Sequence, residues 1–265
     1  MALLPCRVKY TTMAKAKGII QIIGTIGGVT YYLSNGKYLA KNKGGGFSTT
    51  ANKTYPHYER VRENGLEFGG STRAAKFFRQ AFGPYLKRPF MRGLCPRTVK
   101  LMQHLVKFDM SSVRGKRVPH IGIHHPQGKA LLCGFEMNPA APVSRLLKAP
   151  FVMDAAAGVL TIAGLGALNI AFPKGATAAG IMLQAISFDF ESDSAFAVSP
   201  EAFVAKGAAA SDLSLQVATP VIAGQGNQLP VVFYVLHVRF YQEVNQVSVP
   251  YNDEGTRAMT VIAVL

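Results

Sequence analysis

The chain has 265 residues, of which 49% are hydrophobic and 16% are charged, and it contains 26 glycines. This composition excludes a disordered protein and is typical of a globular chain rich in strands and turns, with one large β domain or two modest domains. Its three cysteines, Cys6, Cys95 and Cys133, are odd in number and lack C-x-x-C spacing. We therefore expect neither a disulfide framework nor a cysteine zinc site, and the cysteine usage favours a reducing compartment.

The net charge of +15 is distributed unevenly along the chain. Residues 1–117 hold 22 Lys and Arg against four acids, a net charge of +18, whereas residues 118–265 hold seven against ten, a net charge of −3. We therefore predict two parts, a basic region over 1–117 and a β domain over 118–265. A basic region joined to a slightly acidic domain is expected to meet a polyanion or an acidic surface of another subunit.

The N-terminal segment predicts a small β unit and no secretory signal. Residues 1–18 contain no continuous apolar run, so synthesis in the cytoplasm is expected, and Met13 is an alternative start. Over residues 18–41, Asn35-Gly36 separates two apolar, aromatic runs, which predicts a β-hairpin with a type I′ turn. The glycines at 24, 27 and 28 do not match nucleotide-binding spacing and are interpreted as turn residues.

Residues 42–70 show no hydrophobic period. Three successive glycines, Pro56 and scattered tyrosines and arginines predict an extended arm that orders only by lying on another surface.

Two amphipathic helices follow, one between Ser71 and Gly83 and one from near Pro96. Each has an apolar stripe on one face and basic residues on another. The basic face is either solvated or faces an anion, and both interpretations stay open. Candidate contacts to a neighbouring copy or a polyanion, from the arm, the helices and their connection, are Arg60, Arg62, Arg73, Lys76, Arg79, Lys87, Arg88, Arg97, Lys100 and Lys107.

From Leu146 onward, short strands separated by turn residues predict an antiparallel β-sandwich. Its central strand is Val231–Val244, where alternation predicts burial on both faces in the first half and on one face in the second. Expected strands are 150–153, 159–163, 167–172, 181–190, 213–218, 231–244, 247–251 and 258–265. A membrane hairpin over 155–188 is rejected, since glycines, an asparagine and Pro173 interrupt it. The fold class is thus α+β: a basic N-terminal β-hairpin, an extended arm and two amphipathic helices, followed by the sandwich.

Two clusters of potential ligands do not support a metal site. His120, His124 and His125 have helical ligand spacing, but nearby Pro and Gly argue against a helix there. Asp189, Glu191 and Asp193 would share one strand face, and a solvated edge is favoured over calcium binding because no loop of the required spacing accompanies them. We expect no metal and no cofactor.

Several segments resemble a family of uncharacterised bacterial proteins. The similar pieces are MAKAKGIIQIIGTIGGVTYY with KYLAKNKGG, then RVRENGLEFGGSTRAAKFFRQAF, and VRFYQEVNQ near the C-terminus. The resemblance covers the first 70 or so residues best and the last 35 next. The resemblance implies no activity and no functional residues. It implies only that these segments occur together as parts of one protein architecture.

These features favour a self-assembling structural subunit of a homopolymeric particle, tube or fibre. The arm would become ordered by lying on a neighbouring copy, and the basic region of one copy would contact the acidic domain of the next. Such contacts repeat head to tail between copies. The alternative is a nonspecific nucleic-acid-binding protein that uses the basic N-terminal half. An enzyme is not expected, because the sequence has no G-x-S-x-G, no H-E-x-x-H and no paired-carboxylate signal.

Overall fold

The computed structural model describes residues 13–15, 22–43, 49–83, 85–86, 93–188, 194–220, 230–251 and 253–265. The chain forms two compact units, Met1–Glu59 and Arg60–Leu265. The predicted boundary at residue 117 falls inside the second unit. Helices and antiparallel sheets are both present, so the prediction of an α+β chain is confirmed.

The first unit contains a four-stranded antiparallel sheet in the order β1-β4-β3-β2. Its strands are β1 (Met13–Lys15), β2 (Gly24–Ile26), β3 (Val29–Ser34) and β4 (Lys37–Asn42), followed by α1 (Thr49–Thr54) and the 3-10 helix η1 (Pro56–Tyr58). Asn35 and Gly36 join β3 to β4 with φ of 51° and 72°. Both values are positive, as a type I′ turn requires, so the predicted hairpin is confirmed.

The second unit is built on two long antiparallel strands, β7 (Ala178–Phe188) and β11 (Val231–Val244). The shorter strands β8 (Ser194–Val198) and β9 (Ala202–Ala205) pair with β7, and β12 (Val247–Pro250) and β13 (Arg257–Val264) pair with β11. A separate three-stranded sheet has the order β10-β6-β5. Its strands are β5 (Phe151–Asp154), β6 (Val159–Leu165) and β10 (Ser211–Gln216).

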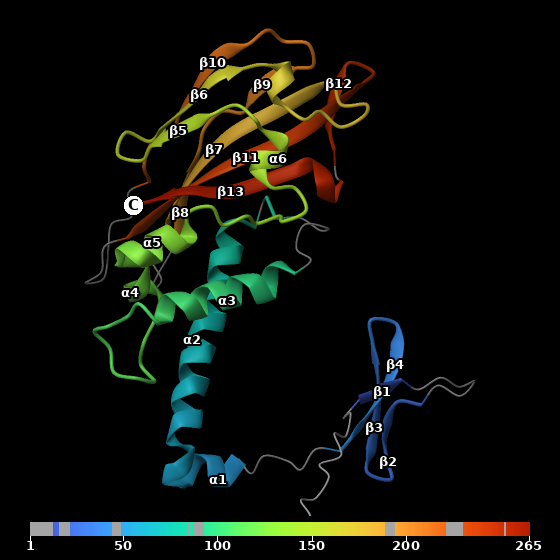
Figure 1. Ribbon diagram of the computed structural model, residues 1–265, viewed down its shortest axis with the longest axis vertical. Helices are drawn as coiled ribbons and strands as arrows, with labels where there is room; N and C mark the ends of the chain where they lie inside the picture. Colours follow the sequence, from blue (N-terminus) through green and yellow to red (C-terminus); the bar gives the residue numbers. More distant parts are fainter. Residues whose placement is uncertain are drawn as a thin grey trace, which may run out of the picture. The chain divides into compact units, whose positions relative to one another are not determined.

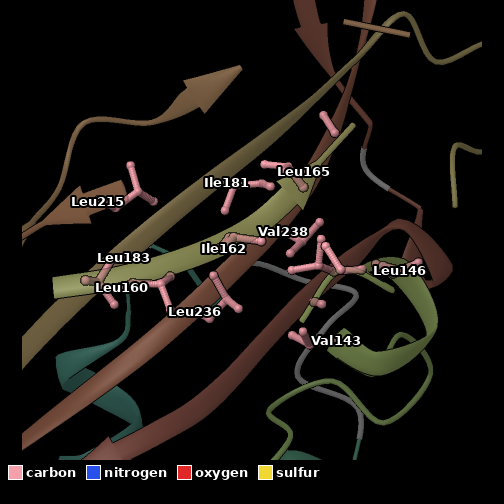
Figure 2. Packing of buried hydrophobic residues seen from close by; sticks show 14 of the residues in the cluster. Val143, Leu146, Leu160, Ile162, Leu165, Ile181, Leu183, Leu215, Leu236 and Val238 are labelled. Carbon is pink, nitrogen blue, oxygen red and sulfur yellow. The ribbon is translucent and has the colours of Figure 1, made fainter. Parts of the chain in front are cut away.

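β11 separates two hydrophobic cores, because alternate side chains of a strand point to opposite faces. Its even positions, from Val232 to Phe240, join a cluster with Leu160 and Ile162 of β6. Figure 2 shows part of this cluster, including Leu183 of β7 and Leu146 of α6 (Val143–Leu146). The odd positions Val231, Phe233 and Val235 join the other cluster. The prediction for the first half of this strand is confirmed, because its first eight residues are buried. The second half is not buried along one face as predicted, because Tyr241 is buried and the last three residues are exposed.

Helices cover the second face of the six-stranded sheet (Figure 1). They are α2 (Glu59–Ala81), α3 (Leu94–Val106), α4 (Pro119–His124) and α5 (Pro126–Leu132). Phe78 of α2 contacts Phe188 and Phe233 of the sheet, with ring centroids 5.5 and 5.4 Å apart. Two more 3-10 helices, η2 (Ala167–Asn169) and η3 (Glu254–Thr256), lie in connections. The packing of Phe78 fixes the C-terminal half of α2 on the sheet, whereas the N-terminal half of α2 has no fully buried residue before Ser71.

Two segments before residue 126 differ from the sequence prediction. The expected extended arm over residues 42–70 contains α1 and η1 and is helical from Glu59 onward. In α2, Arg60 pairs with Glu63 one turn away, and Arg114 and Arg117 bind Glu63 and Glu67 from a distant loop. The His120–His125 segment was expected not to be helical, yet His120 and His124 lie in α4, and His125 is the extended residue between α4 and α5. Pro119 and Pro126 stand at the first helical position, where a missing N–H costs nothing.

Candidate functional site

A cleft with a volume of about 680 Å³ lies between α2 and α3. Its α2 wall consists of Asn64, Glu67, Phe68 and Ser71, its α3 wall consists of Lys100, Gln103, His104, Val106 and Lys107, and Arg117 comes from the following loop. The cleft therefore collects cationic and hydrogen-bonding side chains from both amphipathic helices. Lys100 and Lys107 belong to the predicted contact residues, and both are exposed.

The carboxylate in the cleft wall is neutralised within the chain. Arg117 donates from Nε to Glu67 Oε1 at 2.7 Å and from Nη2 to Oε2 at 2.9 Å, and the Gly115 N–H donates to the same carboxylate. The Arg117 hydrogen bonds are the main reason that the pKa of Glu67 lies below its ordinary value, although burial opposes this shift. With Glu67 paired in this way, the remaining charge in the cleft is positive.

Two predicted contact residues serve the fold instead. Arg79 of α2 donates to the hydroxyl of Thr98 on α3, and so joins the two helices. Arg97 donates to the backbone carbonyl of Glu136 at 2.6 Å and lies over the ring of Phe135, 5.0 Å from its centroid. These guanidinium groups are half-buried and hold α3 in place.

The other predicted residues divide by exposure. Arg60, Arg73, Lys76, Lys100 and Lys107 are exposed, and Arg62 is half-buried. Lys87 and Arg88 lie outside the described residues. The structure thus brings Lys100 and Lys107 together in the cleft, whereas Arg73 and Lys76 follow α2 outside its lining.

The N-terminal half of α2 carries large exposed apolar side chains. Val61, Leu66 and Phe68 are 44%, 66% and 52% exposed. Gly65 and Gly69 lie in the same stretch, and a Cβ added to either would meet no atom within 4 Å. Glycine inside a helix costs about 0.5–1 kcal/mol relative to alanine, and nothing within the described chain requires it here. The composition of this half-helix suits close approach by another molecule.

The four-stranded sheet of the first unit has two chemically different faces. Residues directly paired in an antiparallel register share a face, so the register of β2, β3 and β4 sorts their side chains. One face is largely apolar and aromatic: Gly24, Ile26, Val29, Tyr31, Leu33, Tyr38, Ala40 and Asn42. The other is largely polar and basic: Thr25, Thr30, Tyr32, Ser34, Lys37, Leu39 and Lys41. Over residues 22–43, no side chain is fully buried, and on the apolar face Ile26 and Leu33 are exposed.

A polar cluster on the six-stranded sheet was not anticipated from the sequence. Glu201 accepts a hydrogen bond from Arg239 Nε at 2.7 Å and from the Tyr241 hydroxyl at 2.8 Å. Burial is the main cause that raises the pKa of Tyr241, and the hydrogen bond to Glu201 adds to it. The alternation of Arg239 and Tyr241 on one strand was the available signal, but Glu201 is 38 residues away from Arg239 in sequence.

His237 lies on the same face of β11 as Arg239 and is 5% exposed. Its Nε2 is 2.8 Å from Gln184 Oε1, and its ring meets that of Tyr85 edge-on, with centroids 5.0 Å apart. Burial, followed by repulsion from Arg239 and Arg257, lowers the pKa of His237 to about 3. This imidazole is therefore neutral and packed into the interface between sheet and helices.

Among the residues that the structure describes, no three His, Cys, Asp or Glu side chains gather closely enough to hold a metal ion. Within the same ranges, no helix combines the length and apolar character needed to cross a membrane. No protein-family model, no curated protein and no solved structure matches the chain. The resemblance noted from the sequence segments stays a prediction.

Proposed function

We propose that this protein is a self-assembling structural subunit of a homopolymeric particle, tube or fibre, rather than an enzyme. The first unit, Met1–Glu59, supplies the contact to a neighbouring copy, and the two sheets of the second unit form a β-sandwich body. The observation that carries the proposal is the exposure of large apolar side chains on one face of the four-stranded sheet, where Ile26 and Leu33 are 59% and 49% exposed.

A small sheet needs a covered hydrophobic face to be stable in water. Strands of three to six residues without one buried side chain over 22–43 do not meet this condition alone. A second copy of the chain satisfies it, because it offers apolar surface such as Val61 and Leu66 on α2. A contact between two different surfaces is heterologous, and its repetition gives a closed ring or an open helical polymer.

The test is the assembly state of the full chain and of variants on the two sheet faces. Light scattering after size-exclusion chromatography and negative-stain electron microscopy should show large, regular species for the unmodified chain. Val29→Lys with Leu33→Lys places two charges on the apolar face and should give smaller species. Thr30→Lys with Ser34→Lys adds the same charge to the opposite face and should assemble normally. A clean monomer of the unmodified chain at micromolar concentration would disprove the proposal.

A further inference from the structure

The α2–α3 cleft has an unbalanced charge that self-assembly through the first unit does not use. Lys100, Lys107 and Arg117 contribute three cations to its described lining, against the single carboxylate of Glu67. Because Arg117 occupies that carboxylate through two hydrogen bonds, neither lysine is needed to neutralise it. The two lysines thus leave positive charge facing an open cleft, which attracts an anion.

The α3 wall arranges its donors along one line. Lys100, His104 and Lys107 follow each other at intervals of four and three residues, so they share one face of the helix. Seven residues of helix place Lys100 and Lys107 about 10 Å apart along its axis. Gln103 also lines the cleft between them. An extended chain of anionic groups fits this line better than a single small anion, which one lysine would hold.

The opposite wall contributes an aromatic ring. Phe68 lines the cleft and is 52% exposed, although a phenyl ring gains more by burial in a core. Asn64 and Ser71 flank it on the same helix and offer hydrogen-bonding groups. Cations on one wall and an exposed ring on the other are the two components with which proteins hold single-stranded nucleic acids.

We propose that the α2–α3 cleft binds single-stranded nucleic acid, with Lys100 and Lys107 contacting phosphates and Phe68 stacking on a base. An acidic polypeptide would satisfy the lysines but has no regular planar group for the ring. A duplex would also satisfy them, but its bases are stacked inside and do not reach a side chain in the cleft wall. Binding is nonspecific in sequence, because every base has a face on which phenylalanine stacks.

Fluorescence polarisation with a labelled oligothymidylate and the full-length chain measures this binding at several salt concentrations. Lys100→Glu with Lys107→Glu should weaken affinity by at least about tenfold at low salt, because each phosphate contact releases condensed counterions. The slope of log affinity against log salt should fall by about 1.4, since each contact to a single strand contributes about 0.7. Lys148→Glu with Lys206→Glu makes the same charge change at exposed positions outside the cleft and should bind as the unmodified chain does.

The aromatic contact is tested separately. Phe68→Ala should weaken oligothymidylate binding by about fivefold or more without changing the salt slope, because the ring contact involves no ionic charge. Phe68→Tyr should retain the affinity, because tyrosine keeps an aromatic ring on which a base stacks. Circular dichroism of each variant checks folding, and light scattering in the same buffer checks assembly. Loss of oligothymidylate binding with unchanged assembly thus separates this proposal from that of self-assembly.

Three results would overturn the proposal. The first is equal binding by the Lys100, Lys107 variant and its charge-matched control. The second is displacement of oligothymidylate by polyglutamate as effectively as by unlabelled oligothymidylate, which would indicate a site for acidic protein. The third is tighter binding to a matched duplex together with no effect of Phe68→Ala, which would remove the base-stacking role.

Discussion

Arg117 and Glu67 form a two-point ion pair, with Nε to Oε1 at 2.7 Å and Nη2 to Oε2 at 2.9 Å. The pair connects the loop that follows α3 to the N-terminal half of α2. Arg114 makes a parallel contact with Glu63 at 3.3 Å. Through these contacts, a helix that buries little of its own surface before Ser71 is held by charge. The same contacts shape one wall of the cleft.

Glu67→Gln should therefore destabilise the second unit at neutral pH. Replacing the carboxylate by an amide removes charge-assisted hydrogen bonds, and we expect a loss of about 1.5–3 kcal/mol in the free energy of unfolding. The pKa of Glu67 is lowered in the folded chain, so its contribution is complete above the unfolded value of 4.5 and is lost as the pH falls through the folded pKa. Urea unfolding at neutral and acidic pH measures both effects. Glu243→Gln, at an exposed position, is the control, and equal losses in both variants would contradict the prediction.

Gly180→Ala should disrupt the polar cluster on the six-stranded sheet. A Cβ at this position would lie 2.0 Å from Glu201 Oε1 and 2.8 Å from Tyr241 Cε2. Both groups must move, at a cost of about 1–3 kcal/mol, the range for overpacking a filled site. Gly69→Ala is the matched control, because its Cβ meets nothing within 4 Å and alanine favours the helix by about 0.5–1 kcal/mol. Denaturant unfolding should give opposite signs for the two variants, and a stabilising Gly180→Ala would be inconsistent with the cluster.

The elements that the sequence predicted well carry their signal in local pattern. β11 was predicted with its observed bounds because β-branched and aromatic residues run from Val231 to Val244 without Gly or Pro. The β3–β4 hairpin was predicted because Asn35-Gly36 suits the turn geometry by itself. In both cases, nearby residues are sufficient to determine the structure.

Most of the elements that the sequence pattern did not predict make contacts with residues far away in the sequence. The N-terminal half of α2 contains Gly65, Gly69 and Gly70, which lower helix propensity, and the ion pairs that support it come from about 50 residues away. A strand was expected over 167–172, but Ala167–Asn169 is a 3-10 helix. β8 and β9 were not expected at all; both form by pairing with β7.

The candidate site was predictable in residue type but not in residue role. Spacing on the helices identified Arg79, Arg97, Lys100 and Lys107 as one basic set. Tertiary contacts then assign the two arginines to Thr98 and to the carbonyl of Glu136, and leave the two lysines in the cleft. Phe68 was not selected, because its exposure follows from the direction in which α2 leaves the sheet, and no local pattern encodes that direction.

Stability should fall more steeply with acid in the unmodified chain than in His237→Gln. The pKa of His237 is about 3 in the folded chain, owing first to burial, against 6.5 as its ordinary value. Below pH 6.5, His237 is therefore protonated in the unfolded chain but stays neutral in the folded chain. As the pH falls from 6.5 to 3, this difference lowers the free energy of unfolding by about 1.4 kcal/mol per pH unit. Glutamine can still donate to Gln184, so the fold is kept. Chemical unfolding from pH 7 downward measures the two slopes, and parallel curves would show that His237 is protonated in the fold.

Arg73→Glu with Lys76→Glu should impair assembly while leaving the folded chain intact. Both residues are exposed on α2, and reversing their charge removes attraction to an acidic neighbour and introduces repulsion. Arg79 is unsuitable for this test, because it joins α2 to Thr98 and its reversal would damage the fold. Exposed substitutions cost within about 0.5 kcal/mol, so the unfolding free energy should stay unchanged.

Light scattering against protein concentration should show the onset of assembly of this variant raised by about tenfold or more, the effect of a difference of about 1.4 kcal/mol per contact. Lys148→Glu with Lys206→Glu carries the same charge change on the β-rich half and should keep the original onset. If the α2 variant assembles at the same concentration as this control, Arg73 and Lys76 form a solvated helix face, and the contact between copies rests on the apolar surfaces alone.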